Sequence, residues 1–354
     1  MISIADVAKA AGVSTATVSR VLNDPNRVRP DTRARVLAVM EELNYRPNPL
    51  AQGIRRNSSG VIGALVPMLS PSFGSILSGI VKEAAKNGQS VLLSPSYRTA
   101  EEESAAISNL IDKPLDAVIY LPRHVGIPLP KLEYFQNIPI VGAGRRTLGF
   151  DAPCVYSDNE QSGYLATRYL IGTGRQRIAF AAGFLTDPAG TPVIRSRAEF
   201  FELLDSPYAG AYIATDRFRG YRQALEEANL PFDEALLFPG GFSYECGIRA
   251  AHAILSAQNV DGVVASNDNS AVGMIQTFLS QGYSVPEDIS VVGFDDIPLA
   301  AQVTPALTTI HQQTEEIGRQ AVCLVNRLLR GETSVEDVRI EVSLVTRAST
   351  VRKF

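Results

Sequence analysis

Small residues, most of them polar, lie together with one arginine on one side of a short predicted helix near the start of the chain. The group consists of Ser14, Thr15, Ala16, Thr17, Ser19, Arg20 and Asn23. Small side chains allow close approach to another surface, and an α-helix fits the major groove of DNA. Arg20 can donate two hydrogen bonds to guanine O6 and N7. These residues therefore indicate a DNA-contacting face; the alternative is a surface helical hairpin.

Two short helices joined by a tight turn are needed to present this face. The apolar positions of the first helix are spaced i, i+3, i+4 and i+7, and they are Ile4, Val7, Ala8 and Ala11. Gly12 can end this helix in the left-handed conformation, and Ser14 can cap the second helix. Val18, Val21 and Leu22 then fall on the inner side of the second helix. We predict a helix-turn-helix over residues 4–23.

A third helix extends the candidate DNA surface. Proline is favoured at a first helical position, which predicts a helix from about Pro30. The residues expected on its inner face are Val36, Leu37, Met40 and Leu43. Further candidate phosphate or base contacts surround this helix, and they are Arg27, Arg29, Thr32 and Tyr45.

The charge of the chain is unevenly distributed. Residues 1–56 hold nine Lys and Arg against five Asp and Glu, a net charge of +4. The whole chain carries −4, so the remainder carries −8. A basic N-terminal segment on an acidic body concentrates the attraction for phosphates in that segment.

Five short motifs give the N-terminal segment a family resemblance. They are IADVA at 4–8, AGVS at 11–14, TVSRVLN at 17–23, TR at 32–33 and LNYRPN at 43–48. Together they resemble the LacI/GalR family of transcriptional repressors. The resemblance implies a homodimer that binds a near-palindromic double-stranded operator, because one N-terminal domain reads only a half-site.

Residues 47–58 are predicted to link the DNA-binding domain, residues 1–46, to the rest of the chain. Asn48 and Pro49 are suitable residues for a helix start, but the segment is shorter than the roughly 12–15 residues that an isolated helix needs. We expect a helix only against its symmetry mate in the minor groove. By resemblance, Ile54 is the apolar wedge there, and Asn48, Ala51 and Arg55 also contact DNA. A plain flexible linker is the alternative.

From residue 59 the pattern alternates between strands and helices, which predicts parallel sheets covered by helices. Strands are expected near 60–66, 90–93, 117–121, 138–141, 154–156, 176–181, 235–238, 262–265 and 289–292. Helices are expected near 73–87, 101–111, 129–136, 161–171, 217–228, 244–256, 270–281 and 315–329. The predicted fold is thus an all-α helix-turn-helix domain followed by an α/β core.

Motifs at 217–221, 265–268, 285–296 and 304–312 are also similar to the family. They imply that residues 59–354 form a two-lobed core of the type I periplasmic-binding-protein class, which binds an effector and dimerises. The expected N-lobe is about 59–172 and 304–330, and the expected C-lobe about 175–297 and 336–354. Three crossovers are expected near 172–175, 297–304 and 330–336.

Ligands of parallel sheets bind beyond the carboxyl ends of the strands, and Asn267 and Asp295 each end a strand there. The full set of candidate effector contacts is Ser72, Phe73, Arg217, Phe242, Asn267 and Asp295, with Arg123, Arg146 and Gln312 as weaker candidates. The aromatic residues can instead be core residues. Asn267 and Asp295 can instead cap loops, and Arg217 can instead form a structural ion pair.

Residues 184–216 are longer than the corresponding loop of the family. The apolar and acidic run at 199–204 predicts a partly helical insertion. Long ordered loops are often lids or contact surfaces, and we hypothesise that this one shapes access of the effector.

Composition excludes several classes of protein. Apolar residues make up 45% of the chain, but no stretch has the length of a membrane span, and the N-terminus has no secretory signal pattern. We therefore expect a cytoplasmic, nucleoid-associated protein without a membrane role. The Cys and His residues lack ligand spacing, so no metal or cofactor is expected; they are Cys154, Cys246, Cys323, His124, His252 and His311. No catalytic constellation is present in the sequence, so we expect no enzyme activity.

Two interpretations remain. The first is a repressor whose operator affinity is controlled by a small molecule, which the resemblance implies is a sugar or sugar phosphate, or else a nucleoside or purine. The alternative is a periplasmic-type sugar-binding protein, or an enzyme of similar fold, without a DNA role. The effector, the operator, the direction of regulation and a tetramer are left open by the sequence.

Overall fold

The computed structural model describes residues 2–45, 58–67, 71–96, 100–121, 135, 138–146, 152–184, 194–207, 209–257 and 259–351. The chain forms two compact units, Met1–Gly60 and Val61–Phe354. Several predicted site residues lie outside the described residues, namely Asn48, Ala51, Ile54, Arg55 and Arg123.

The N-terminal unit confirms the predicted helix-turn-helix. It contains α1 (Ile4–Ala11), α2 (Thr15–Asn23), the 3-10 turn η1 (Pro25–Arg27) and α3 (Pro30–Glu42). Gly12 ends α1 with a φ of +64°, and the hydroxyl of Ser14 accepts a hydrogen bond from the Thr17 amide at 3.1 Å. An unpredicted capping box precedes α1, because the Asp6 carboxylate accepts from the Ser3 amide at 2.8 Å.

The core of the N-terminal unit consists of apolar residues from all three helices. The buried ones are Val7, Ala8, Ala11, Val18, Val21 and Val36, and the half-buried Tyr45 packs against them. The expectation for Leu37 is wrong, since its side chain is 44% exposed. Each helical residue is rotated by about 100° from the last, and only Val36 of this pair points at α1 and α2.

The second unit contains two six-stranded sheets. Sheet A has the order β11-β5-β4-β3-β1-β2, and all its strands are parallel. They are β1 (Val61–Pro67), β2 (Ser90–Ser96), β3 (Ala117–Tyr120), β4 (Ile140–Gly144), β5 (Cys154–Ser157) and β11 (Val338–Ile340).

Sheet B has the order β12-β10-β9-β8-β6-β7, and only β12 is antiparallel to its neighbour. Its strands are β6 (Ile178–Phe184), β7 (Leu237–Gly241), β8 (Gly262–Val264), β9 (Ser290–Asp295), β10 (Thr308–His311) and β12 (Ser343–Val345). The short strands β10, β11 and β12 were not predicted.

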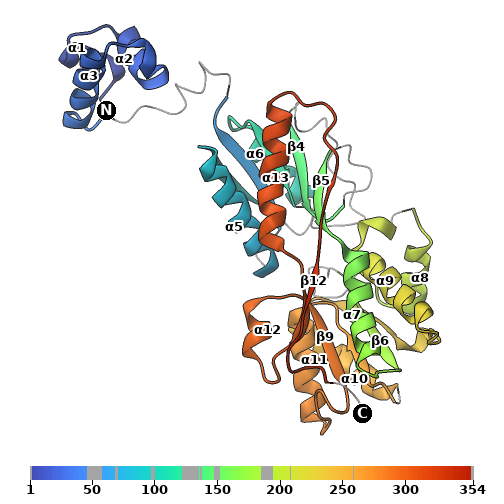
Figure 1. Cartoon of the computed structure of the whole chain (residues 1–354). Coiled ribbons are helices and arrows are strands. Elements are labelled where there is room, and N and C mark those ends of the chain that lie inside the picture. The colour runs from blue at the N-terminus through green and yellow to red at the C-terminus, as the bar shows by residue number, and fades with distance from the viewer. Residues whose placement is uncertain are drawn as a thin grey trace. The chain divides into compact units, whose positions relative to one another are not determined.

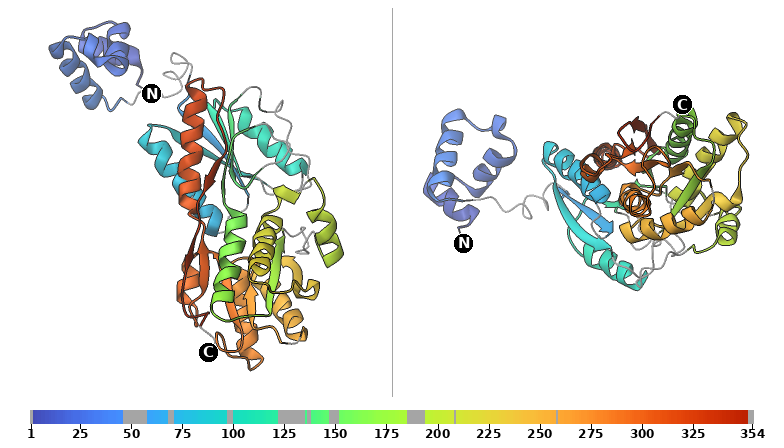
Figure 2. Two further views of the ribbon diagram at one scale, coloured as in Figure 1. Left: turned by 45° about the vertical axis from the view of Figure 1, so that its right-hand side comes forward. Right: turned by 90° about the horizontal axis from the view of Figure 1, so that it is seen from below.

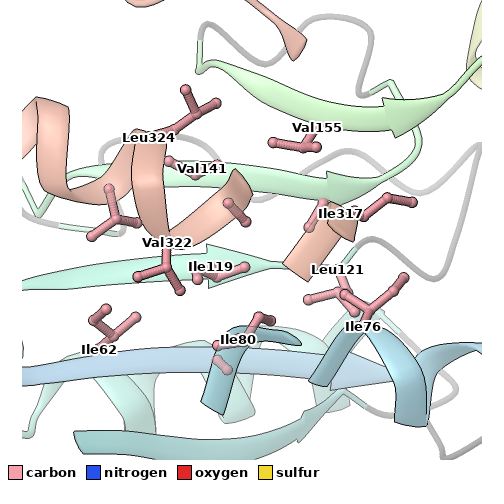
Figure 3. Close-up of a cluster of buried hydrophobic side chains, with 14 of the residues drawn as sticks. Ile62, Ile76, Ile80, Ile119, Leu121, Val141, Val155, Ile317, Val322 and Leu324 are labelled. Atoms are coloured by element: carbon pink, nitrogen blue, oxygen red, sulfur yellow. The ribbon is translucent and has the colours of Figure 1, made fainter. Parts of the chain in front are cut away.

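Helices cover both sheets, which confirms the predicted α/β core. The helices α5 (Pro71–Lys86) and α13 (Thr314–Leu329) lie side by side on one face of sheet A (Figures 1 and 2). Their apolar residues, including Ile76, Ile80, Ile317 and Val322, interlock with those of the strands (Figure 3). Residues of α6 (Ala100–Ile111) build a second apolar cluster with sheet A.

Sheet B carries its helices in two groups. The pair α10 (Tyr244–Ser256) and α11 (Asp268–Ser280) contributes to one apolar cluster with sheet B. A second cluster contains α7 (Asn159–Gly172), α8 (Arg197–Leu204) and α9 (Ile213–Glu227). The remaining short helices are η3 (Ala209–Ala211), η4 (Glu234–Leu236) and α12 (Pro298–Gln302).

The points where the chain changes sheet differ from the predicted crossovers. Strand β10 pairs with β9 in sheet B, and β11 pairs with β5 in sheet A. Helix α7 packs against α9, beside sheet B (Figure 1). The chain therefore changes sheet near 157–159, 311–314 and 340–343. Strand pairing joins residues that are far apart in sequence, so the local pattern did not fix these points.

Two glycines let α7 and α9 approach closely. A Cβ atom at Gly163 would lie 1.9 Å from the carbonyl oxygen of Arg217, and one at Gly220 would lie 1.9 Å from that of Glu160. Any side chain at these positions would separate the helices. This backbone contact fixes the start of α9, and with it Arg217, against α7.

Candidate functional site

The candidate DNA face of α2 lies on the outside of the N-terminal unit. Ser14, Thr15, Ala16 and Arg20 are exposed, and Thr17 and Ser19 are half-buried. The side chain of Asn23 is outside the described residues. The hydroxyls of Ser14 and Thr17 are 2.9 Å apart and share a hydrogen bond. The cap thus holds the first turn of α2 in place beneath its exposed face.

Three arginines differ in how they are held. Arg27 forms an exposed ion pair with Asp24 at 3.0 Å. Arg20 and Arg29 are exposed and form no ion pair within the described part of the chain. A guanidinium without a protein partner can bind a phosphate or a base edge without first breaking a contact. Thr32 is half-buried near the start of α3.

Arg217 is the centre of a buried polar cluster at the carboxyl end of sheet B. Its side chain is only 4% exposed. Its Nε donates to Asn159 Oδ1 at 3.1 Å, and its Nη1 donates to the carbonyl of Ser266 at 2.7 Å. The guanidinium lies 4.1 Å above the ring of Phe294. Burial lowers the pKa of Arg217 to about 10, and the nearby carboxylates of Asp295 and Asp268 oppose that shift.

Asp295 connects this cluster to a crossover. Gln312 donates from Nε2 to Asp295 Oδ1 at 2.6 Å, and the carbonyl of Gln312 accepts from the Ser157 hydroxyl at 3.1 Å. Asp295 has a φ of +109°, and Asp296 has a φ of +58°. Non-glycine residues rarely adopt these backbone conformations, and such strain is concentrated at functional sites. A ligand that contacts Asp295 would act on residues at two crossovers.

Asn267 caps helix α11, which favours capping, its alternative interpretation, over contact with the effector. Its Oδ1 accepts from the Ser270 amide at 3.0 Å, and its own amide donates to Ser270 Oγ at 3.1 Å, which forms a capping box at the start of α11. The next residue, Asp268, is fully buried and was missed by the sequence analysis. Burial and the charge of Asp295 raise the pKa of Asp268 well above its usual value.

The two candidate aromatic residues are placed differently. A Cβ atom at Gly183 would lie 2.4 Å from Cε1 of Phe242 and 2.6 Å from Cβ of Ser266. Phe242 is half-buried there, beside the residue whose carbonyl binds Arg217. Phe73 is half-buried and packs against the core of sheet A, which favours its alternative interpretation as a core residue. Ser72 belongs to α5, but its side chain is outside the described residues.

Two consecutive arginines follow β4 at the carboxyl end of sheet A. The predicted residue, Arg146, is largely exposed, lies 5.3 Å from the centre of the Tyr156 ring, and lies 3.8 Å from Asp337. Its neighbour Arg145 buries its Nη2 atom and was missed. Two adjacent arginines after a strand look alike in a sequence, and only the fold distinguishes the buried one.

The insertion after β6 contains the predicted helix, α8. Phe200 of α8 is fully buried, and Arg197 donates to the carbonyls of Leu237 and Ala235, each at 2.7 Å. These contacts attach α8 to strand β7 and to η4. The role of the insertion in effector access remains a hypothesis, and residues 185–193 lie outside the described residues.

A groove of about 790 Å³ lies among the described residues. It is lined mainly by residues of α5 and α13, six of which are charged, and it also contacts Asp295 and His311. The groove does not include Arg217 or Phe242. Of the described helices, none is both long and apolar enough to span a membrane. Over the same residues, no group of three or more His, Cys, Asp or Glu could hold a metal ion.

Comparison with known proteins covers both units. Residues 3–48 match the bacterial regulatory proteins of the lacI family, and residues 167–350 match the periplasmic binding protein-like domain. The chain is 33% identical to the HTH-type transcriptional repressor PurR of Photorhabdus laumondii, over 99% of this chain and 97% of that protein.

Solved structures give the same result. The complex of the transcriptional regulator CelR with cellobiose is 30% identical, with a TM-score of 0.70 over 99% of this chain and 100% of that one. The lac repressor dimer bound to operator and the anti-inducer ONPF is 26% identical, with a TM-score of 0.81 over 99% of each chain. The chain belongs to the lacI family of DNA-binding transcriptional repressors.

Proposed function

We propose that this chain is a homodimeric repressor that binds a near-palindromic operator and is controlled by a small molecule bound between sheets A and B. The observation that carries the proposal is the exposed face of α2, where Arg20 has no ion-pair partner among the described residues. The structure of the lac repressor, a dimer bound to its operator, supports both operator binding and a homodimer for this chain. The predicted contacts are those of the helix-turn-helix, together with the hinge residues Asn48, Ala51, Ile54 and Arg55.

The polar cluster around Arg217 supports the control by an effector. Its members come from α7, α9, the end of β8, the end of β9 and the β10–α13 crossover. Hydrogen bonds join Arg217 to Asn159 and Ser266, another joins Gln312 to Asp295, and the charges of Arg217 and Asp295 interact. A ligand that binds Asp295 competes with the hydrogen bond from Gln312. Because Ser157, Asn159 and Gln312 lie at crossovers, such competition shifts the balance between two arrangements of the sheets.

A sugar or sugar phosphate is the effector class that the comparisons favour, since the structure of the CelR regulator contains cellobiose. A purine or nucleoside, which the family resemblance of the sequence also implies, is the second candidate class. Arg146, Arg217, Phe242, Asn267 and Asp295 are the described candidate contacts. Because Arg217 and Asn267 already have protein partners, we assign them mainly to positioning Asp295 and the start of α11.

Selection of binding sites from random duplex DNA tests the proposal. We expect the full-length chain to enrich a sequence with two-fold symmetry. Its affinity should fall by roughly 10³-fold or more between 50 and 200 mM salt, as expected when about six or more phosphates are contacted. If no sequence is enriched, or if the enriched site lacks two-fold symmetry, the proposal of a homodimer bound to a near-palindromic operator is contradicted.

A further inference from the structure

Arg145 is a half-buried cation at the carboxyl end of sheet A. It follows Gly144, the last residue of β4, which has a φ of +96°. Its carbonyl accepts a hydrogen bond from the thiol of Cys154 at 2.7 Å, which holds the backbone at this point. The side chain therefore starts from a fixed position at the carboxyl end of sheet A, where ligands of parallel sheets bind.

Arg145 is half-buried, and one of its guanidinium nitrogens is fully buried without a hydrogen bond. That nitrogen, Nη2, has no hydrogen-bond partner among the described residues. A buried charged donor without a partner carries the full cost of desolvation. By contrast, Arg217 donates from Nε to Asn159 and from Nη1 to the Ser266 carbonyl. Of these two arginines, Arg145 is the one with a buried donor that a ligand can use without displacing a protein group.

The surroundings of Arg145 come from both sheets. Tyr120 of β3 donates to Glu103 of α6 at 2.7 Å, so this carboxylate is already engaged by a phenol. Tyr212, which precedes α9 beside sheet B, lies close enough to Arg145 to interact with its charge. Burial lowers the pKa of Arg145 to about 10. The guanidinium nevertheless stays charged at neutral pH and lies between groups from the two lobes.

We propose that Arg145 is the receptor for an oxyanion of the effector, a carboxylate or a phosphate, so that the effector is an acidic small molecule. Hydrogen bonds between a guanidinium and an oxyanion are about twice as strong as neutral ones, and the largely exposed Arg146 adds a second positive charge at the same strand end. This inference rests on the proposed effector control. Within the candidate classes it favours a sugar phosphate over a neutral sugar, nucleoside or purine.

Thermal unfolding of the full-length protein in sodium phosphate and in sodium chloride of equal ionic strength tests the inference, with inorganic phosphate as the probe. The variants are Arg145→Met, which removes the buried donor, and Arg168→Met as the control, because Arg168 is exposed on α7 and is not a candidate effector contact. We expect phosphate to raise the melting temperature of the wild type and of Arg168→Met. Arg145→Met should lower the apparent phosphate affinity at least tenfold. Phosphate bound by the basic N-terminal unit would affect all three proteins equally.

A second readout excludes a merely structural role for Arg145. Without phosphate, Arg145→Met should melt at the wild-type temperature or above it, because a buried donor without a hydrogen-bond partner has been removed. The inference is overturned if the wild type gains nothing from phosphate over chloride, or if Arg145→Met gains as much as the wild type. Operator binding by the wild type and by Arg145→Met is also measured without phosphate. If both bind the operator but phosphate has no specific effect, the inference about Arg145 fails while the proposed DNA binding stands.

Discussion

The N-terminal unit and the two-sheet core use arginine in opposite ways. Arg20 is exposed and has no ion-pair partner among the described residues, whereas Arg217 is buried and bonded to Asn159 and Ser266. An exposed cation costs little to maintain and is available for a partner. A buried, paired cation fixes the position of its neighbours. The difference separates a surface that binds from a cluster that couples parts of the core.

Replacing Arg217 should have the largest effect on stability. In Arg217→Met the Asn159 and Ser266 acceptors lose their donor and the charge of Asp295 is no longer balanced, so we expect a loss of about 3–5 kcal/mol in the free energy of unfolding. Urea unfolding measures this loss. Arg222→Met is the matched control, because Arg222 is exposed on the same helix and its loss should cost less than about 1 kcal/mol. Equal effects in the two variants would show that Arg217 is not a positioning residue.

Asp216 should make stability depend on pH. Burial raises the pKa of Asp216 from its usual 3.8 to about 6. Between these values the folded protein binds a proton that the unfolded chain releases, so this group lowers stability as the pH rises from 4 to 6. Relative to Asp216→Asn, the wild type should lose about 2–3 kcal/mol across that window. Urea unfolding at several pH values measures the difference. The exposed Asp205→Asn is the control, and its difference from the wild type should stay constant.

Replacing Arg20 should affect DNA binding and leave stability alone. Arg20→Ala should weaken binding to the selected duplex by about 5- to 150-fold, the equivalent of about 1–3 kcal/mol for a bidentate contact to guanine. Its melting temperature should match the wild type. Fluorescence anisotropy with the selected duplex and with single-base variants measures both affinity and specificity. If Arg20→Ala still discriminates every base as the wild type does, Arg20 does not read a base.

The cap of α2 should give the smallest effect. Ser14→Ala removes the acceptor of the Thr17 amide, which should cost the N-terminal unit about 1 kcal/mol. Thr15→Ala is the control, because it lies in the same turn and has no role in the cap. Hydrogen exchange of the α2 amides should rise in Ser14→Ala alone. Similar exchange in the two variants would show that the hydrogen bond between Ser14 and Thr17 does not stabilise the start of α2.

Local features of the fold could be predicted from the sequence, and pairings between distant residues could not. Gly12 and Ser14 act on their own neighbours, and the turn between α1 and α2 was predicted from them. Helix α10 (Tyr244–Ser256) was likewise predicted to the residue from its local pattern. The crossovers were misplaced because β10 and β11 are short strands that are defined by their partners, β9 and β5.

The candidate site shows the same limit. Asp295 was selected because it ends a strand, and Phe242 because its ring could stack on a ligand. Both lie near the Arg217 cluster. Arg145 was missed in favour of Arg146, since the local sequence does not show which of the two adjacent arginines lies near Tyr212, far away in the sequence. The contacts of Asn159 were equally hidden, because they depend on the close packing of α7 against α9.

The central claim is that DNA binding belongs to the N-terminal unit alone and that the core carries its control. The most direct test compares the full-length chain with a chain that starts at residue 59, on the selected duplex, across a range of salt concentrations. We expect salt-dependent operator binding from the full-length chain and none from the truncated one. Operator affinity that survives the truncation would contradict this assignment.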